Sequence, residues 1–140
     1  LKVIRPKINI LNQPCPLFVP LVEEGLTRGP ITKLIVESYL SHFKNTDVDT
    51  LILGCTHYPI LTAVIKDVVG KNISLVDSGK ATAKVVMDVL KKNGILSKES
   101  NGGVHSFVTD SKQSFQKVIT KALTSEINIS IKSINRIDIG

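Results

Sequence analysis

The nine residues from Leu51 to Pro59 read LILGCTHYP and place a cysteine and a histidine directly after an apolar run. The run 51–53 has no polar alternation, which predicts a strand covered on both faces, as in parallel sheets. Pro59 suits a first helical position, and the apolar spacing that follows predicts a helix as far as Val69. Cys55 is therefore expected in a strand-to-helix loop.

Such a loop suits thiol chemistry. The carboxyl edge of an open α/β sheet is where ligands bind, and the amides of a helix start favour anions. His57, two residues from Cys55, could stabilise a thiolate, while the Thr56 hydroxyl and nearby amides could hold a carboxylate. Acid–base and nucleophilic roles for Cys55 are both open, as is a plain packing role for a small apolar side chain.

Strand and helix patterns alternate along the rest of the chain. Expected strands are 8–11, 51–53, 73–76, 104–109 and 127–131, and expected helices are 20–28, 30–43, 59–69, 80–92 and 111–123. Ser78 is the expected N-cap of the helix over 80–92. This β-α alternation predicts an α/β fold built on a parallel sheet of the doubly wound kind.

Composition sets bounds on partners and location. The chain has 140 residues, 42% of them hydrophobic, and no apolar run approaches the roughly 18 residues of a membrane span. Two cysteines in unlike settings form no disulfide framework, which fits a reducing cytoplasm. The net charge is +6, but the basic residues are dispersed and aromatics make up only 4%. We therefore expect neither a membrane nor a nucleic-acid partner.

Three other functions compete at this stage. A zinc site could draw on Cys15, His42, Cys55, His57 or His105, but the sequence lacks paired ligands at the usual spacing, so no metal is expected. A hydrolase or transferase could use Cys55 as a nucleophile with His57 as its base. A non-catalytic α/β binding module is the third alternative.

Three segments together resemble the glutamate racemases, of the aspartate/glutamate racemase family. They are Cys15–Glu23 (CPLFVPLVE), Leu51–Pro59 (LILGCTHYP) and Val76–Gly79 (VDSG), in the family's order. The continuation His57-Tyr58-Pro59 favours glutamate over aspartate, since the related aspartate racemases differ after the same Gly-Cys-Thr. The resemblance extends over nearly the whole chain and is weakest in the last thirty or so residues.

The resemblance implies a cofactor-independent interconversion of L- and D-glutamate, in which two cysteines on opposite faces exchange the α-proton. Cys55 matches the second catalytic cysteine. Thr56 and His57 match substrate-binding positions, with His57 also assisting the cysteine, and Glu23 falls where the family has an acidic site residue, although Glu24 is adjacent. The implied role is a bacterial, cytoplasmic one, supplying D-glutamate for peptidoglycan.

The resemblance covers only the family's C-terminal half. The motif of the first catalytic cysteine and the early Asp-Ser loop are not in this sequence, and Cys15, between two prolines, is expected to be structural. Residues 1–77 match part of the second racemase domain, and 78–140 the returning part of the first. The two pseudo-symmetric domains are thus incomplete here, and this fragment alone is expected to lack full activity. Expected partners are glutamate, the missing N-terminal half and, through uncovered strands, further copies of the chain.

Overall fold

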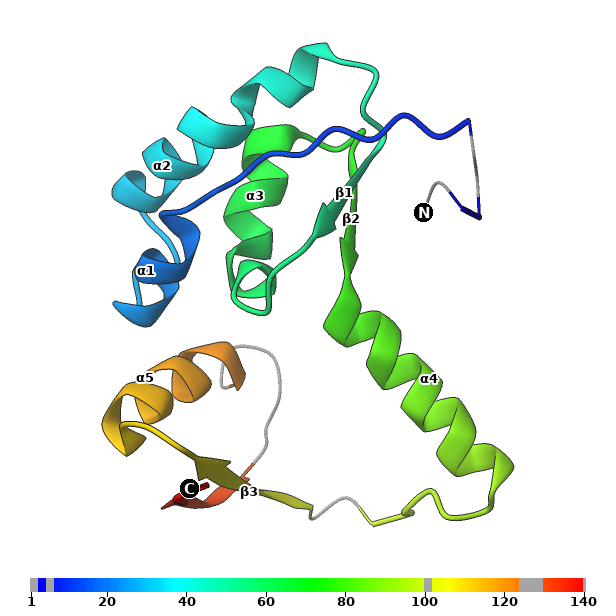
Figure 1. Cartoon of the computed structure of the whole chain (residues 1–140), viewed down its shortest axis with the longest axis vertical. Helices are drawn as coiled ribbons and strands as arrows, with labels where there is room; N and C mark the ends of the chain where they lie inside the picture. Colours follow the sequence, from blue (N-terminus) through cyan, green and yellow to red (C-terminus); the bar gives the residue numbers. More distant parts are fainter. Residues whose placement is uncertain (1–2, 5–6, 100–101, 124–129, 140) are drawn as a thin grey trace.

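The computed structural model describes residues 3–4, 7–99, 102–123 and 130–139. Its elements alternate along the chain as an α/β fold (Figure 1). In order they are α1 (Phe18–Glu23), α2 (Pro30–Leu40), η1 (Ser41–Asn45), β1 (Thr50–Leu53), η2 (Tyr58–Leu61), α3 (Thr62–Val69), β2 (Ser74–Asp77), α4 (Ser78–Lys92), β3 (Gly103–Val108), α5 (Lys112–Leu123) and β4 (Ser130–Arg136). Within these ranges no helix is long and apolar enough to cross a membrane.

The strands form two parallel pairs. β1 pairs with β2 in the register Thr50↔Ser74 to Leu53↔Asp77. β3 pairs with β4, with an irregularity between Val104 and His105. Parallel pairing requires a crossover, and helices supply it in both cases. The predicted parallel α/β arrangement is therefore present.

The main core lies between β1 and the helices α1, α2 and α3. Its buried members are Cys15, Phe18, Leu21, Val22, Val36, Leu40, Phe43, Leu53, Leu61, Ile65, Val68, Val69 and Ile73. α1 ends where Gly25 takes φ 72°, a left-handed conformation that glycine adopts without steric cost. This core holds the end of α1 and the loop after β1 in fixed positions.

Two sequence predictions about the first sheet are wrong. Residues 8–11 are extended but form no strand, because no described neighbour offers them a hydrogen-bonded edge. The run 51–53 is covered on one face only: Leu53 is 3% exposed, whereas Ile52 is 50% exposed. Both differences have one cause, since the sheet has only β1 and β2 in the described part of the chain.

Helix starts also differ from expectation. Asp77 caps α4 in place of Ser78, since its Oδ1 accepts hydrogen bonds from the amides of Gly79 at 2.7 Å and Lys80 at 3.4 Å. Pro59 lies in the 3₁₀ turn η2, and α3 starts only at Thr62.

Other boundaries shift as well. The helix predicted over 20–28 is α1, which lies earlier, at Phe18–Glu23. The single helix predicted over 30–43 is α2 followed by η1, which extends to Asn45. Of the strand predicted over 127–131, residues 127–129 lie outside the described residues. β4 includes the remainder and continues to Arg136.

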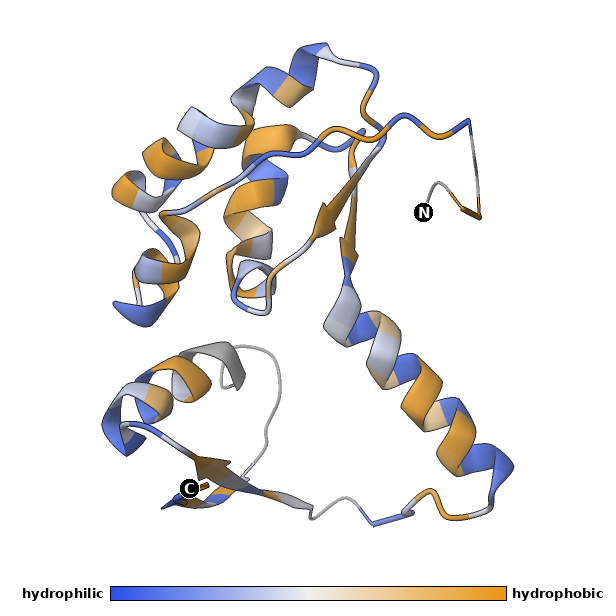
Figure 2. Cartoon of the chain, viewed as in Figure 1, coloured by the Kyte–Doolittle hydropathy of each residue, from blue (hydrophilic) through white to orange (hydrophobic). Residues whose placement is uncertain are grey.

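Helix α4 has an apolar side that nothing in the described chain covers. It runs from the end of β2 toward the part that contains β3 and α5 (Figure 1), and none of its residues is buried. Hydrophobic residues recur along it in the colouring of Figure 2. The side chains of Val85, Val86, Met87 and Val89 are 40–61% exposed. An uncovered apolar stripe of this kind indicates a contact surface. Self-association of the chain stays a prediction.

Candidate active site

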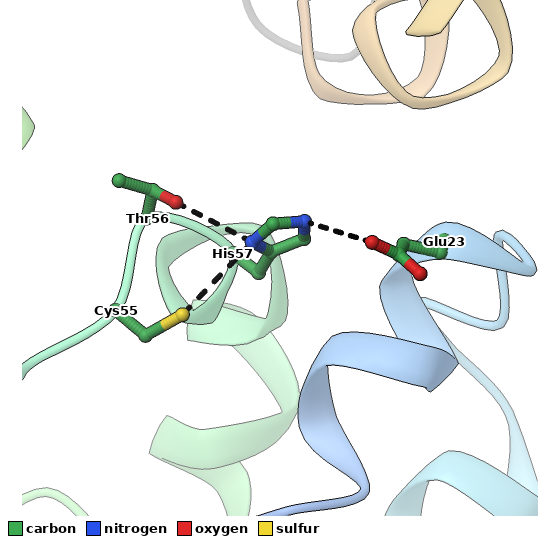
Figure 3. Close-up of polar contacts among 4 residues, drawn as sticks. All are labelled: Glu23, Cys55, Thr56 and His57. Atoms are coloured by element: carbon green, nitrogen blue, oxygen red, sulfur yellow. Dashed lines mark hydrogen bonds and ion pairs between the residues drawn. The ribbon is translucent and has the colours of Figure 1, made fainter. Parts of the chain in front are cut away.

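The candidate site is built from the loop after β1 and the end of α1. Cys55, Thr56 and His57 lie between β1 and η2, in the predicted strand-to-helix loop. Glu23, the last residue of α1, faces them from the other side (Figure 3). Glu23 and His57, which are 34 positions apart in sequence, therefore meet here, and the four residues that the sequence singles out are brought together.

His57 is at the centre of this group. Its Nδ1 lies 3.9 Å from Cys55 Sγ and 3.3 Å from Thr56 Oγ1, while its Nε2 lies 3.6 Å from Glu23 Oε1. A carboxylate beside Nε2 favours the tautomer that carries its proton on Nε2. Nδ1 then presents a lone pair toward the Cys55 thiol. The arrangement equips His57 to take a proton from sulfur, with Glu23 orienting the ring.

The exposure of the site suits access by a small molecule. The side chains of His57 and Glu23 are 29% and 59% exposed, and Cys55 is half-buried. Once His57 has taken a proton, its contact with Glu23 is a partly exposed ion pair, which contributes only about 0.2–1 kcal/mol. Glu23 therefore orients His57 more than it stabilises the fold.

The structure assigns a supporting role to Tyr58 that the sequence does not reveal. The Tyr58 hydroxyl donates a hydrogen bond to the backbone carbonyl of Cys15 at 3.2 Å, and its ring meets that of Phe18 edge-on at 5.1 Å. Burial, followed by the charge of Cys15, raises the pKa of Tyr58. These contacts join the loop to the segment before α1. No local sequence signal indicates them, because the partners are 43 residues apart.

The second cysteine stands apart from this chemistry. Cys15 is 4% exposed in the core, and burial raises the pKa of its thiol to about 11. Its sulfur lies 3.6 Å from the carbonyl of Gln13. Among the described residues no cluster of three histidine, cysteine or acidic side chains could hold a metal ion.

The thiols of Cys15 and Cys55 should therefore be alkylated at very different rates. At pH 8 about one Cys15 thiol in a thousand is ionised if its pKa is about 11, and the group is also buried. We expect iodoacetamide to modify Cys55 at least a hundredfold faster than Cys15, as followed by peptide mass spectrometry. In urea the two rates should converge. Equal rates in the native protein would contradict the burial of Cys15.

The buried Cys15 thiol should also affect how the stability of the fold changes at alkaline pH. Its pKa rises from 9.0 to about 11 on folding, so the native state holds this proton more tightly than the unfolded state. The resulting stabilisation is complete below about pH 9 and is lost as the pH rises through about 11. Cys15→Ala should therefore show a shallower fall in Tm between pH 8 and 10.5 than the parent chain, in differential scanning calorimetry. Parallel pH profiles would argue against this origin.

Several known proteins similar to this chain are glutamate racemases. No protein-family model matches it. It is 40% identical over 128 residues to the glutamate racemase of Geobacter metallireducens, covering 91% of this chain and 47% of that protein. It is 41% identical over 129 residues to that of Aquifex aeolicus, covering 92% and 48%. The chain thus spans about half the length of the curated relatives it matches.

Solved structures give the same result. A glutamate racemase from Francisella tularensis in complex with D-glutamate superposes with a TM-score of 0.78 at 30% identity, covering 98% of this chain and 50% of that one. One from Thermus thermophilus in complex with β-chloro-D-alanine gives 0.71 at 33% identity, covering 91% and 47%. The chain therefore has a parallel-stranded α/β fold that matches about half of these glutamate racemase structures. It is a homologue of the glutamate racemases.

Proposed function

We propose that this chain forms one side of a glutamate racemase site, in which Cys55 exchanges the α-proton of glutamate. The observation that carries this proposal is the line of contacts from Glu23 through His57 to Cys55 at the end of β1. Homology to glutamate racemases supports the choice of substrate. The product, D-glutamate, would serve peptidoglycan synthesis.

The proposed proton path uses the geometry directly. His57 Nδ1 accepts the proton of the Cys55 thiol, and the Glu23 carboxylate stabilises the imidazolium that results. The thiolate then takes the α-proton of glutamate, leaving a carbanion on that carbon. Thr56 and the loop amides hold the substrate carboxylate.

A proton returned to the same face restores the starting enantiomer, so inversion needs an acid on the opposite face. Cys15 cannot supply it, because it is buried in the core with a pKa of about 11. We propose that this acid belongs to the part of the racemase that has no counterpart in this chain. Residues 1–77 would then belong to the second racemase domain and 78–140 to the first.

The test is proton exchange in heavy water. The chain is incubated with L- or D-glutamate, alone and with a complementary polypeptide, defined as the part of the Geobacter metallireducens glutamate racemase without a counterpart here. NMR follows the α-proton and optical rotation follows handedness. We expect the chain alone to exchange only the enantiomer whose α-proton faces Cys55, and the mixture to exchange and invert both. Folded protein that shows neither α-proton exchange nor inversion would overturn the proposal. A covalent acyl adduct would indicate a hydrolase or transferase instead.

The site carboxylate can be assigned by a matched pair of variants. Glu23→Gln should slow α-proton exchange by up to about fivefold, since a half-exposed ion pair contributes about 0.2–1 kcal/mol. Glu24→Gln should leave the rate unchanged, because Glu23 is the residue that contacts His57. The initial exchange rate in heavy water measures both. A slower exchange rate in Glu24→Gln, with no change in Glu23→Gln, would assign the site carboxylate to Glu24.

A further inference from the structure

The Nδ1 atom of His57 has two neighbours that compete for it. Thr56 Oγ1 lies 3.3 Å away and Cys55 Sγ lies 3.9 Å away, and the two side chains approach the ring from different sides (Figure 3). With the ring proton on Nε2, where the Glu23 carboxylate favours it, Nδ1 has a single lone pair. Only one of the two side chains can therefore use Nδ1 fully at a time.

Thr56 is the better placed of the two in the structure. Its hydroxyl is the nearer donor, and an O–H group donates a stronger hydrogen bond than an S–H group does. The amide of Tyr58 donates to the carbonyl of Cys55 at 3.3 Å, which closes the turn that contains all three side chains and holds them at these separations. The Thr56 hydroxyl thus occupies the atom that would take the proton from the thiol.

Thr56 is also accessible to a ligand, because the residue is exposed. A threonine hydroxyl has one proton to donate, so it cannot serve His57 and a ligand together. A carboxylate accepts a stronger hydrogen bond than a neutral ring nitrogen does, because it is charged. A carboxylate beside Thr56 would therefore take over the hydroxyl proton and leave Nδ1 of His57 to Cys55.

We propose that Thr56 couples the binding of an amino-acid carboxylate to activation of the Cys55 thiol. With no carboxylate bound, the Thr56 hydroxyl donates to Nδ1 of His57, and the cysteine keeps its proton. When a carboxylate binds, the hydroxyl turns to it. The S–H bond of Cys55 then breaks, its electron pair stays on sulfur, and the proton forms a bond to Nδ1. Thr56 keeps its own proton throughout and acts through His57 as a positioning residue.

This coupling would protect the thiol between turnovers. The thiolate is the form that reacts with oxidants and alkylating agents, and Cys55 is only half-buried. A site that forms its thiolate beside a bound carboxylate limits such side reactions. The inference rests on the proposed function for the contact between Thr56 and the substrate carboxylate, but its first test needs no catalysis.

Alkylation of the chain without substrate tests the competition for Nδ1. Thr56→Val nearly keeps the shape of the side chain and removes the hydroxyl, so more of Cys55 should be ionised near neutral pH. We expect iodoacetamide to modify Cys55 at least about twofold faster in Thr56→Val than in the parent chain, the effect of losing one hydrogen bond. Thr56→Ser retains the hydroxyl and should return the parent rate. An unchanged or slower rate in folded Thr56→Val, by peptide mass spectrometry, would overturn the proposal.

Two further variants show whether the effect passes through His57. Thr50→Val is the matched control, since it removes an exposed hydroxyl at the opposite end of β1 from Cys55, and it should leave the alkylation rate unchanged. In a His57→Phe background, Thr56→Val should no longer speed alkylation, because the shared acceptor is gone. An increase of the same size in that background would show a steric effect of Thr56 and overturn the proposal.

The ultraviolet absorbance of the thiolate tests the link to substrate. Glutarate, a dicarboxylate with the carbon chain of glutamate and no amino group, is added to the chain, and the absorbance is measured relative to Cys55→Ser. We expect glutarate to raise the thiolate absorbance at least about twofold in the parent chain and not in Thr56→Val. No rise in the parent, alone or with the complementary polypeptide, would overturn the coupling. Loss of α-proton exchange with these Thr56 effects intact would overturn the proposed function alone.

Discussion

Replacing Cys55 by serine is expected to slow α-proton exchange of glutamate by about 10²–10⁴-fold, the range for loss of a positioned acid–base group. The reason is chemical: a serine hydroxyl is far harder to ionise than a thiol, so His57 cannot generate the base. The rate is measured by NMR in heavy water, with the chain mixed with the complementary polypeptide.

The control for this variant is Cys15→Ala. The Cys15 side chain is buried in the core, and the variant keeps the backbone carbonyl that accepts from Tyr58. Its loss should therefore lower stability and leave the exchange rate of folded protein within a fewfold of the parent. Circular dichroism establishes that each variant is folded. A Cys55→Ser protein that retains the parent rate would exclude Cys55 as the base, and the reverse ranking of the two variants would transfer the role to Cys15.

Truncation of Phe18 to alanine is expected to give the largest loss of stability, about 3–5 kcal/mol. Phe18 is 1% exposed and meets the rings of Tyr39 and Tyr58 edge-on at 5.6 and 5.1 Å. The variant would leave a cavity beneath the site and remove both aromatic contacts. Urea unfolding followed by circular dichroism measures the change.

The neighbouring Leu17 provides the matched control. It is 47% exposed, and surface substitutions usually change stability by no more than about 0.5 kcal/mol. Leu17→Ala should therefore unfold at nearly the same urea concentration as the parent chain. Similar losses for the two variants would show that Phe18 is not the centre of this core.

Local patterns were sufficient to predict the site loop. An apolar run, a glycine and a helix-compatible proline determine where the chain leaves β1 and turns, and all three are encoded within Leu51–Pro59. The position of Glu23 opposite His57 was indicated only by family resemblance. No spacing rule relates the two residues, because the core formed by α1, α2 and α3 sets their distance.

Predictions that depend on distant neighbours were the ones that failed. Residues 8–11 have a strand pattern but no strand partner among the described residues, and Ile52 has an apolar side chain but no covering layer. The N-cap predicted for α4 was wrong for a different reason. Asp77 and Ser78 both suit an N-cap, and β2 continues one residue further than predicted, so that Asp77 is the last residue before the helix. The sequence pattern shows which secondary structure a segment prefers, whereas neighbouring segments decide whether that structure forms.

The hydrogen bond from Tyr58 to Cys15 connects the site loop to the segment before α1. Tyr58 directly follows His57, and Cys15, Phe18 and Tyr58 all line the groove between residues 7–15 and residues 46–54. A molecule bound in that groove would contact residues that also position the site loop. Binding in the groove and chemistry at Cys55 would then depend on the same contacts.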